Sequence, residues 1–185
     1  MTRAIALKIF SYLVIVAFAF YLASRAVVGG SLSVFIAEYG YLGIFFLSIV
    51  SGINIIVPIP IISFMPLFIE SGLNFWLTVL LVTAGLTIGD GVAYMVGAAG
   101  RQVMSEGFRK RIDFFDNFRK KYSHTPFLLL FLFAALAPLP NEVLVIPMAL
   151  AGYRFLPMFP FLLAGNLIYN TLVAFGFIHL FALIT

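Results

Sequence analysis

The 185-residue chain has no cysteine and only two histidines. Without cysteine, neither a disulfide nor a thiolate metal site can form. His124 and His179 lie far apart in the sequence and beside no group of acidic residues, so we expect no metal site. A nucleophile elbow, a glycine-rich phosphate loop and metal-ligand spacings are also missing from the sequence. We therefore expect neither an enzyme nor a bound cofactor.

Charged residues are also scarce in this sequence. Charged residues make up 10% of the chain, whereas hydrophobic residues make up 63%. Soluble domains are about 25% charged and about 45–50% apolar. A soluble fold of this length could not bury so much apolar surface, but lipid can receive it directly. The composition predicts one all-α integral membrane domain over residues 1–185, with several crossings of the plasma membrane.

The basic residues are unevenly placed, since seven of the eleven fall within residues 101–121. Phe115, Phe118 and Tyr122 recur among them at helical spacing, so part of residues 99–124 is predicted to be an amphipathic helix on the membrane surface. The positive-inside rule makes this segment cytoplasmic. We prefer this interpretation to nucleic-acid binding.

The N-terminal segment has two possible meanings. Arg3 and Lys8 precede an apolar run that ends near small residues, as in a cleaved secretory signal. The run nevertheless continues to Val28, which is long enough to span a bilayer. We predict a retained transmembrane helix over residues 4–30, with the N-terminus in the cytoplasm.

Two Pro-x-Pro breaks interrupt the remaining apolar sequence, at Pro58 and Pro60 and again at Pro138 and Pro140. Proline removes a backbone donor and clashes with the preceding helical turn, so a helix ends at each break. The apolar segments that follow end at Gly72 and Gly152 and are too short to span. Each break therefore predicts a re-entrant hairpin followed by a transmembrane helix.

The two breaks belong to an internal repeat over residues 33–98 and 125–185. Shifting the sequence by 80 residues aligns both prolines and the glycine, and it places Asp90 on Asn170. Each unit makes an odd number of crossings, so the second copy is predicted to be inverted relative to the first. Chance matching of hydrophobic residues is the alternative. Interrupted helices in two inverted halves are typical of a transporter's substrate site.

Polar residues inside apolar segments supply the candidates for this site, because such residues usually face a cavity or a partner. Glu142 follows the second break; it either exchanges a proton during transport or caps the short helix. Asp90 is expected to contact the first break and Asn170 the second, unless they only bond neighbouring helices. The remaining candidates are Asn54, Asn141 and Asn166 for a polar path, and Arg154 for a lipid headgroup.

Several of these motifs resemble the DedA family and the wider VTT superfamily. The first half has a Pro-x-Pro break, a glycine and a Gly-Asp-x-x-x-Tyr sequence; the second has Ala-Pro-Leu-Pro-Asn, then Ala-Gly-Tyr and Asn166. The resemblance covers about residues 40–175. It implies two re-entrant hairpins and movement of lipids between leaflets, with polyprenyl phosphate or a phospholipid as partner and protons as a possible coupling ion.

The sequence also departs from the DedA pattern. Bacterial members have an acid after the first break and two arginines around the second, where this chain has Ile61, Ala135 and Asn141. The missing arginines, natural phosphate ligands, count against polyprenyl phosphate. We expect a lipid translocase; the alternatives are a proton-coupled exporter of small cations and a membrane scaffold without transport activity.

Overall fold

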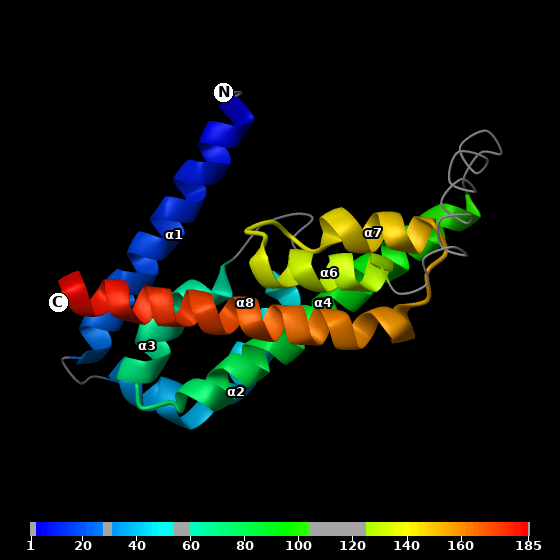
Figure 1. Ribbon diagram of the computed structural model, residues 1–185. Coiled ribbons are helices and arrows are strands. Elements are labelled where there is room, and N and C mark those ends of the chain that lie inside the picture. Colours follow the sequence, from blue (N-terminus) through cyan, green and yellow to red (C-terminus); the bar gives the residue numbers. More distant parts are fainter. Residues whose placement is uncertain (1–2, 28–30, 54–59, 104–124, 185) are drawn as a thin grey trace.

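The computed structural model describes residues 3–27, 31–53, 60–103 and 125–184, and this part is helical without any strand. The all-α prediction is thereby confirmed for the described residues. The elements, shown in Figure 1, are α1 (Arg3–Val27), α2 (Ser31–Ser51), η1 (Ile61–Phe64), α3 (Met65–Glu70), α4 (Phe75–Gln102), α6 (Thr125–Leu136), α7 (Glu142–Leu150) and α8 (Phe155–Ile184).

Two of these helices, α4 with 28 residues and α8 with 30, are long and apolar enough to cross a membrane. The start of α4 is fixed by Asn74, whose Oδ1 accepts a hydrogen bond from the Leu77 amide at 3.1 Å. The predicted surface segment 99–124 begins inside α4, which continues to Gln102. Residues 104–124 of that segment lie outside the described residues.

The short helices α3 and α7 end in the same kind of turn. Gly72 and Gly152 adopt φ angles of 88° and 81°, which only glycine takes up without strain. Two backbone hydrogen bonds close each turn in the pattern of a Schellman motif. They join the amides of Gly72 and Leu73 to Ile69 and Phe68 at 2.9 and 3.1 Å, and those of Gly152 and Tyr153 to Ala149 and Met148 at 3.0 Å each.

Glycines bring the backbones of the long helices together. A Cβ at Gly85 of α4 would lie 2.5 Å from Ser48 Cβ of α2. A Cβ at Gly165 of α8 would likewise lie 2.6 Å from Ala134 Cβ of α6. The pairs α2 with α4 and α6 with α8 therefore pack closely through small residues, as helices do in lipid.

The number of residues that separates equivalent positions in the two halves changes at the helix breaks. The turns at Gly72 and Gly152 lie 80 residues apart, but Ser48 and Ala134, which hold the same place against a glycine, lie 86 apart. Six more residues therefore separate Ser48 from Gly72 than separate Ala134 from Gly152, since these pairs lie 24 and 18 positions apart. The gapless 80-residue alignment holds from Pro60 onward and fails before the break.

Each short helix also rests on the small residues of a long helix. Gly97 of α4 faces α7, because a Cβ there would lie 2.8 Å from both Ala149 Cβ and the Ile146 carbonyl oxygen. Ala19 and Ala23 of α1 are fully buried where α1 packs against α3. Thus α1 lies against the first short helix as α4 lies against the second, although the sequence predicted α1 to stand outside the repeat.

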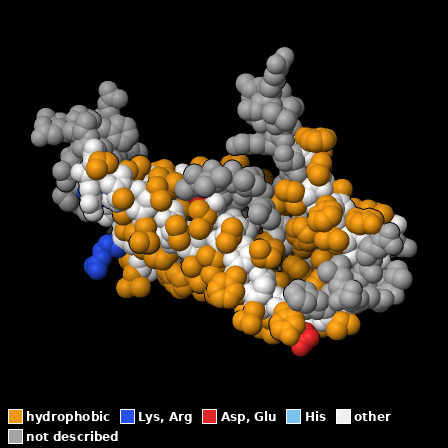
Figure 2. All heavy atoms as spheres, turned by 180° about the vertical axis from the view of Figure 1, so that it is seen from behind, with side chains coloured by type: hydrophobic (Ala, Val, Ile, Leu, Met, Phe, Trp, Pro, Cys, Tyr) orange, Lys and Arg blue, Asp and Glu red, His pale blue; other side chains and the backbone are white. Residues whose placement is uncertain are grey.

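The surface of the described part is far more apolar than that of a soluble protein. Large hydrophobic residues are exposed along α1, α2, α4 and α8, and hydrophobic side chains cover most of the described surface on the face in Figure 2. Buried positions include many polar residues, among them Ser48, Thr78, Thr83 and Thr87. Exposed apolar surface of this extent is rare on soluble monomers.

The close approach of α2 and α4 can be tested at Gly89. A Cβ at this position would lie 2.5 Å from the Gly52 Cα, so Gly89→Ala must push α2 away from α4. Overpacking of this kind costs about 1–3 kcal/mol. Thermal unfolding of the purified protein should show this loss.

Gly43→Ala is the matched control, because a Cβ at Gly43 meets no atom within 4 Å. It should be neutral or stabilising by up to about 1 kcal/mol, since alanine favours the helix. Equal unfolding midpoints for the two variants would contradict the proposed backbone contact.

Candidate functional site

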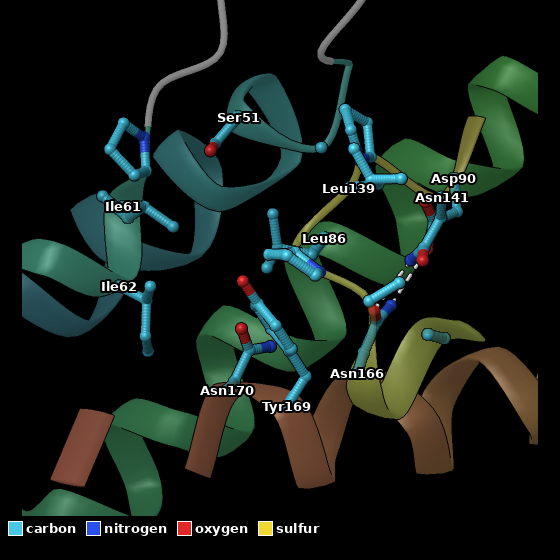
Figure 3. A pocket seen from close by; sticks show the side chains of 16 residues that line it. Ser51, Ile61, Ile62, Leu86, Asp90, Leu139, Asn141, Asn166, Tyr169 and Asn170 are labelled. Carbon is cyan, nitrogen blue, oxygen red and sulfur yellow. Dashed lines mark hydrogen bonds between the residues drawn. The ribbon is translucent and has the colours of Figure 1, made fainter. Parts of the chain in front are cut away.

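A cavity of about 250 Å³ lies where the two helix breaks meet. One side is formed by the end of α2 and by Pro60, Ile61 and Ile62 at the start of η1. The opposite side is formed by α4, α8 and the connection from Ala137 to Asn141 between α6 and α7. Figure 3 shows Ile61 and Ile62 across the cavity from Asp90 and Asn141.

Asp90 is the centre of a hydrogen-bonded cluster on this wall. Its Oδ2 accepts from Asn141 Nδ2 at 3.0 Å and from Asn166 Nδ2 at 2.9 Å. Asn141 Nδ2 also donates to Asn166 Oδ1 at 2.8 Å. Asp90 and Asn166 are only 3% and 5% exposed. The cluster thus joins α4, α8 and the second break in one buried network.

Further polar pairs continue from this cluster along the contact between α4 and α8. Asn166 Nδ2 donates to Thr87 Oγ1 at 3.0 Å, and Asn170 Nδ2 donates to Thr83 Oγ1 at 3.2 Å. Rising numbers on α8 pair with falling numbers on α4, so the two helices run antiparallel. Asn170 also lines the cavity, below Ile62 in Figure 3.

The glycines on either side of Asp90 explain how it reaches the cavity. Gly89 contacts Gly52 of α2, and a Cβ at Gly91 would lie 3.3 Å from the Phe155 ring of α8. Because α4 presents a glycine to each neighbour, it approaches both α2 and α8 closely. The Asp90 carboxylate lies between these two contacts and points into the space that α2, α8 and the second break enclose.

The expected partners of Asp90 and Asn170 were wrong. Asp90 was expected to contact the first break, but its hydrogen bonds go to Asn141 at the second break and to Asn166. Asn170 was expected to serve the second break, but it bonds to Thr83. The physical reason is the contact of Gly97 with α7, which turns this face of α4 toward the second hairpin.

The other predicted site residues are divided between the cavity and its surroundings. Pro60, Pro138 and Pro140 line the cavity. Glu142 is buried in the first turn of α7 but is not part of the lining. Arg154 is exposed and also outside the lining. Pro58 and Asn54 lie outside the described residues.

Gly72 and Gly152 mark turns rather than cavity walls, and their surroundings differ. The Arg101 guanidinium occupies the space that a side chain at position 152 would fill, whereas a Cβ at Gly72 meets nothing within 4 Å. The second turn is further tied to α4 by Tyr94, whose hydroxyl donates to the Tyr153 carbonyl at 2.9 Å.

Asn166, a candidate for a polar path, lies on the cavity lining and in the network, but two further network residues, Thr83 and Thr87, were not among the predicted site residues. Their spacing carried a signal. Thr83, Thr87 and Asp90 recur at i, i+4 and i+7, and Asn166 and Asn170 at i and i+4, so each set lies on one helix face. Polar residues with this spacing in two apolar helices indicate a polar contact between them.

The described lining of the cavity contains one acidic residue and no basic residue. Asp90 is the only acidic residue on the described lining, and no lysine, arginine or histidine belongs to that lining. The other polar groups are the amides of Asn141, Asn166 and Asn170 and the hydroxyls of Ser51 and Tyr169. The arrangement therefore accommodates water, a cation or a neutral polar group better than an anion.

Comparison with family models, with curated proteins and with solved structures finds no match to this chain.

The network around Asp90 can be tested with Asn166→Leu. This change removes donors to Asp90 and Thr87 and leaves a buried carboxyl with one amide partner fewer. Leaving a buried polar group unsatisfied costs about 1–3 kcal/mol, and more for a charged group. The purified protein should unfold at a clearly lower temperature.

Asn170→Leu is the matched control one helical turn away, since it removes only the 3.2 Å bond to Thr83. Its cost should stay near about 1 kcal/mol. A larger loss for Asn170→Leu than for Asn166→Leu would contradict the central place of Asp90 in the network.

Proposed function

We propose that the chain is an integral, multi-pass membrane protein. The apolar outer surface supports this, together with the polar residues among the buried positions. The length and composition of α4 and α8 support it too. A soluble protein with this surface would expose far more apolar area than water tolerates.

We further propose that the two halves form an inverted repeat. The likeness of the two Schellman turns and of the glycine contacts supports a repeated unit. An odd number of crossings in each unit would invert the second copy. The basic segment 99–124 and the N-terminus would then lie in the cytoplasm by the positive-inside rule.

The proposed activity is movement of lipid between the two leaflets. The observation that carries it is the polar cavity at the meeting point of both helix breaks. Interrupted helices inside a membrane occur where they line a cavity or are buried in protein. At about 250 Å³ the cavity cannot enclose a whole lipid, so a polar headgroup would pass through it while the acyl chains stay in the hydrocarbon.

Several of the residues that carry the resemblance to DedA and VTT proteins lie here. Asp90, the Ala-Pro-Leu-Pro-Asn sequence from Ala137 to Asn141, and Asn166 all line the cavity. We therefore propose membership of that superfamily. Polyprenyl phosphate is the less favoured cargo, because no basic residue belongs to the described lining.

A second candidate function, export of small cations coupled to protons, is favoured by one observation. The single acidic residue of the lining is Asp90, and it would attract a cation into the cavity. A scaffold without transport activity is less favoured, since it needs no polar cavity between the breaks.

Leaflet exchange of a fluorescent phospholipid in proteoliposomes tests the leading proposal. The unaltered protein should accelerate exchange, and Asp90→Asn should slow it. Hydrogen bonds to charged groups contribute about 1.5–3 kcal/mol, so the rate should fall roughly ten- to hundredfold. Glu70→Gln is the control, because this exposed carboxyl lies outside the cavity. Protein-independent exchange would contradict the proposal, and uptake of cations instead would favour the second candidate.

Proton coupling is tested separately with Glu142→Gln. Glu142 is buried beside the second break and interacts electrostatically with Asp90, so loss of its proton exchange should alter both rate and pH dependence. Transport by the variant and by the unaltered protein is compared at several pH values. Unchanged rate and unchanged pH profile would exclude Glu142 as the coupling group.

A further inference from the structure

A second hollow lies on the other side of Ile61 from the polar cavity. This apolar groove, of about 570 Å³, runs over α2 and the short helices η1 and α3. Its lining includes Gly40, Gly43, Leu47, Phe64 and Phe68, and the Tyr39 hydroxyl is its only polar side-chain group. The volume lies in the range of about 300–1,000 Å³ that is typical of ligand pockets.

Glycine makes part of this hollow. A Cβ at Gly43 would meet no atom within 4 Å, so the absence of a side chain there leaves open space on α2. Leu47, one turn further along the helix, is 55% exposed at the rim. The groove is therefore open from outside and can admit a flexible apolar chain.

Ile61 lies between the groove and the polar cavity, because it belongs to the lining of both. Its side chain is buried, so a chain that passes from one hollow to the other would have to turn it aside. On one side of it lie Phe64 and Phe68 of the groove, and on the other lies the space that leads to Asp90. Figure 3 shows Ile61 on the cavity wall that faces Asp90 and Asn141. An apolar hollow thus adjoins a polar one that contains a single acidic residue.

We propose that the two hollows together bind one amphiphile with a cationic head and an alkyl tail. The head lies in the cavity beside Asp90, and the tail passes Ile61 into the groove along α2. Charge complementarity selects the head, since Asp90 is the only acidic residue of the described lining and no basic residue accompanies it. Apolar burial holds the tail without selecting its length closely. This assignment rests on the proposed transport function and names the class of its substrate.

Photo-labelling of the full-length protein in phosphatidylcholine nanodiscs tests the assignment. Three single-chain probes share a dodecyl tail with a diazirine near its end, and they differ in the head: trimethylammonium, phosphate or maltose. Mass spectrometry locates the labelled residues. The trimethylammonium probe should label residues 36–50 and 61–68 roughly tenfold more than the phosphate probe, because only its charge is complementary to Asp90.

Two variants separate head from tail. Asp90→Asn should make labelling by the trimethylammonium and phosphate probes equal. Leu47→Trp should fill the groove and remove labelling there by all three probes. Leu80→Trp is its control, because Leu80 is similarly exposed, at 52% against 55%, but does not line the groove.

Three results would overturn the assignment: equal labelling by all heads in the unaltered protein, a head preference that survives Asp90→Asn, or label spread evenly over the exposed apolar surface. Its failure can be told apart from failure of the proposed function. Lipid exchange without head preference counts against the cationic amphiphile alone. Head-selective labelling without any exchange supports the binding site and counts against transport.

Discussion

The contact of α4 with its neighbours through glycine is the constraint on which the structure depends. Gly85 and Gly89 bring α4 against α2, and Gly97 brings it against α7. A side chain at any of these positions would separate the backbones. The helix α4 is the long helix that ends the first half of the chain. It also supports α7, the short helix of the second half. The position of Asp90 between the two breaks follows from this shared role.

The proposed repeat pairs residues of different chemistry. Asp90, Asn141 and Asn166 lie 80 positions away from Asn170, Ile61 and Leu86. All six line the cavity. Asp90, Asn141 and Asn166 are hydrogen-bonded to one another, whereas two of the three counterparts, Ile61 and Leu86, are apolar. Two identical halves would have made a symmetrical cavity. In this one the polar network on α4, α8 and the second break faces Ile61 and Ile62 of η1.

Local features of the fold could be predicted from the sequence, because they depend on neighbouring residues. The short apolar segments end at Gly72 and Gly152, as the pattern predicted, and both glycines adopt positive φ angles there. The partners of Asp90 could not be predicted, since they depend on which face of α4 meets α7, and that contact joins Gly97 to residues some fifty positions away. Ala19 and Ala23 gave no signal inside a continuous apolar run, although they hold α3.

The unequal surroundings of the two glycine turns have a mechanical consequence. The Arg101 guanidinium covers Gly152, and the Tyr94 hydroxyl donates a hydrogen bond to the Tyr153 carbonyl. These two contacts hold the second turn against α4. The Gly72 turn meets no arginine among the described residues, but the Tyr41 hydroxyl accepts a hydrogen bond from the Asn74 amide at 2.9 Å and ties this turn to α2. The two turns are therefore held by different long helices, the first by α2 and the second by α4. A shift of α2 against α4 would move the two turns relative to each other.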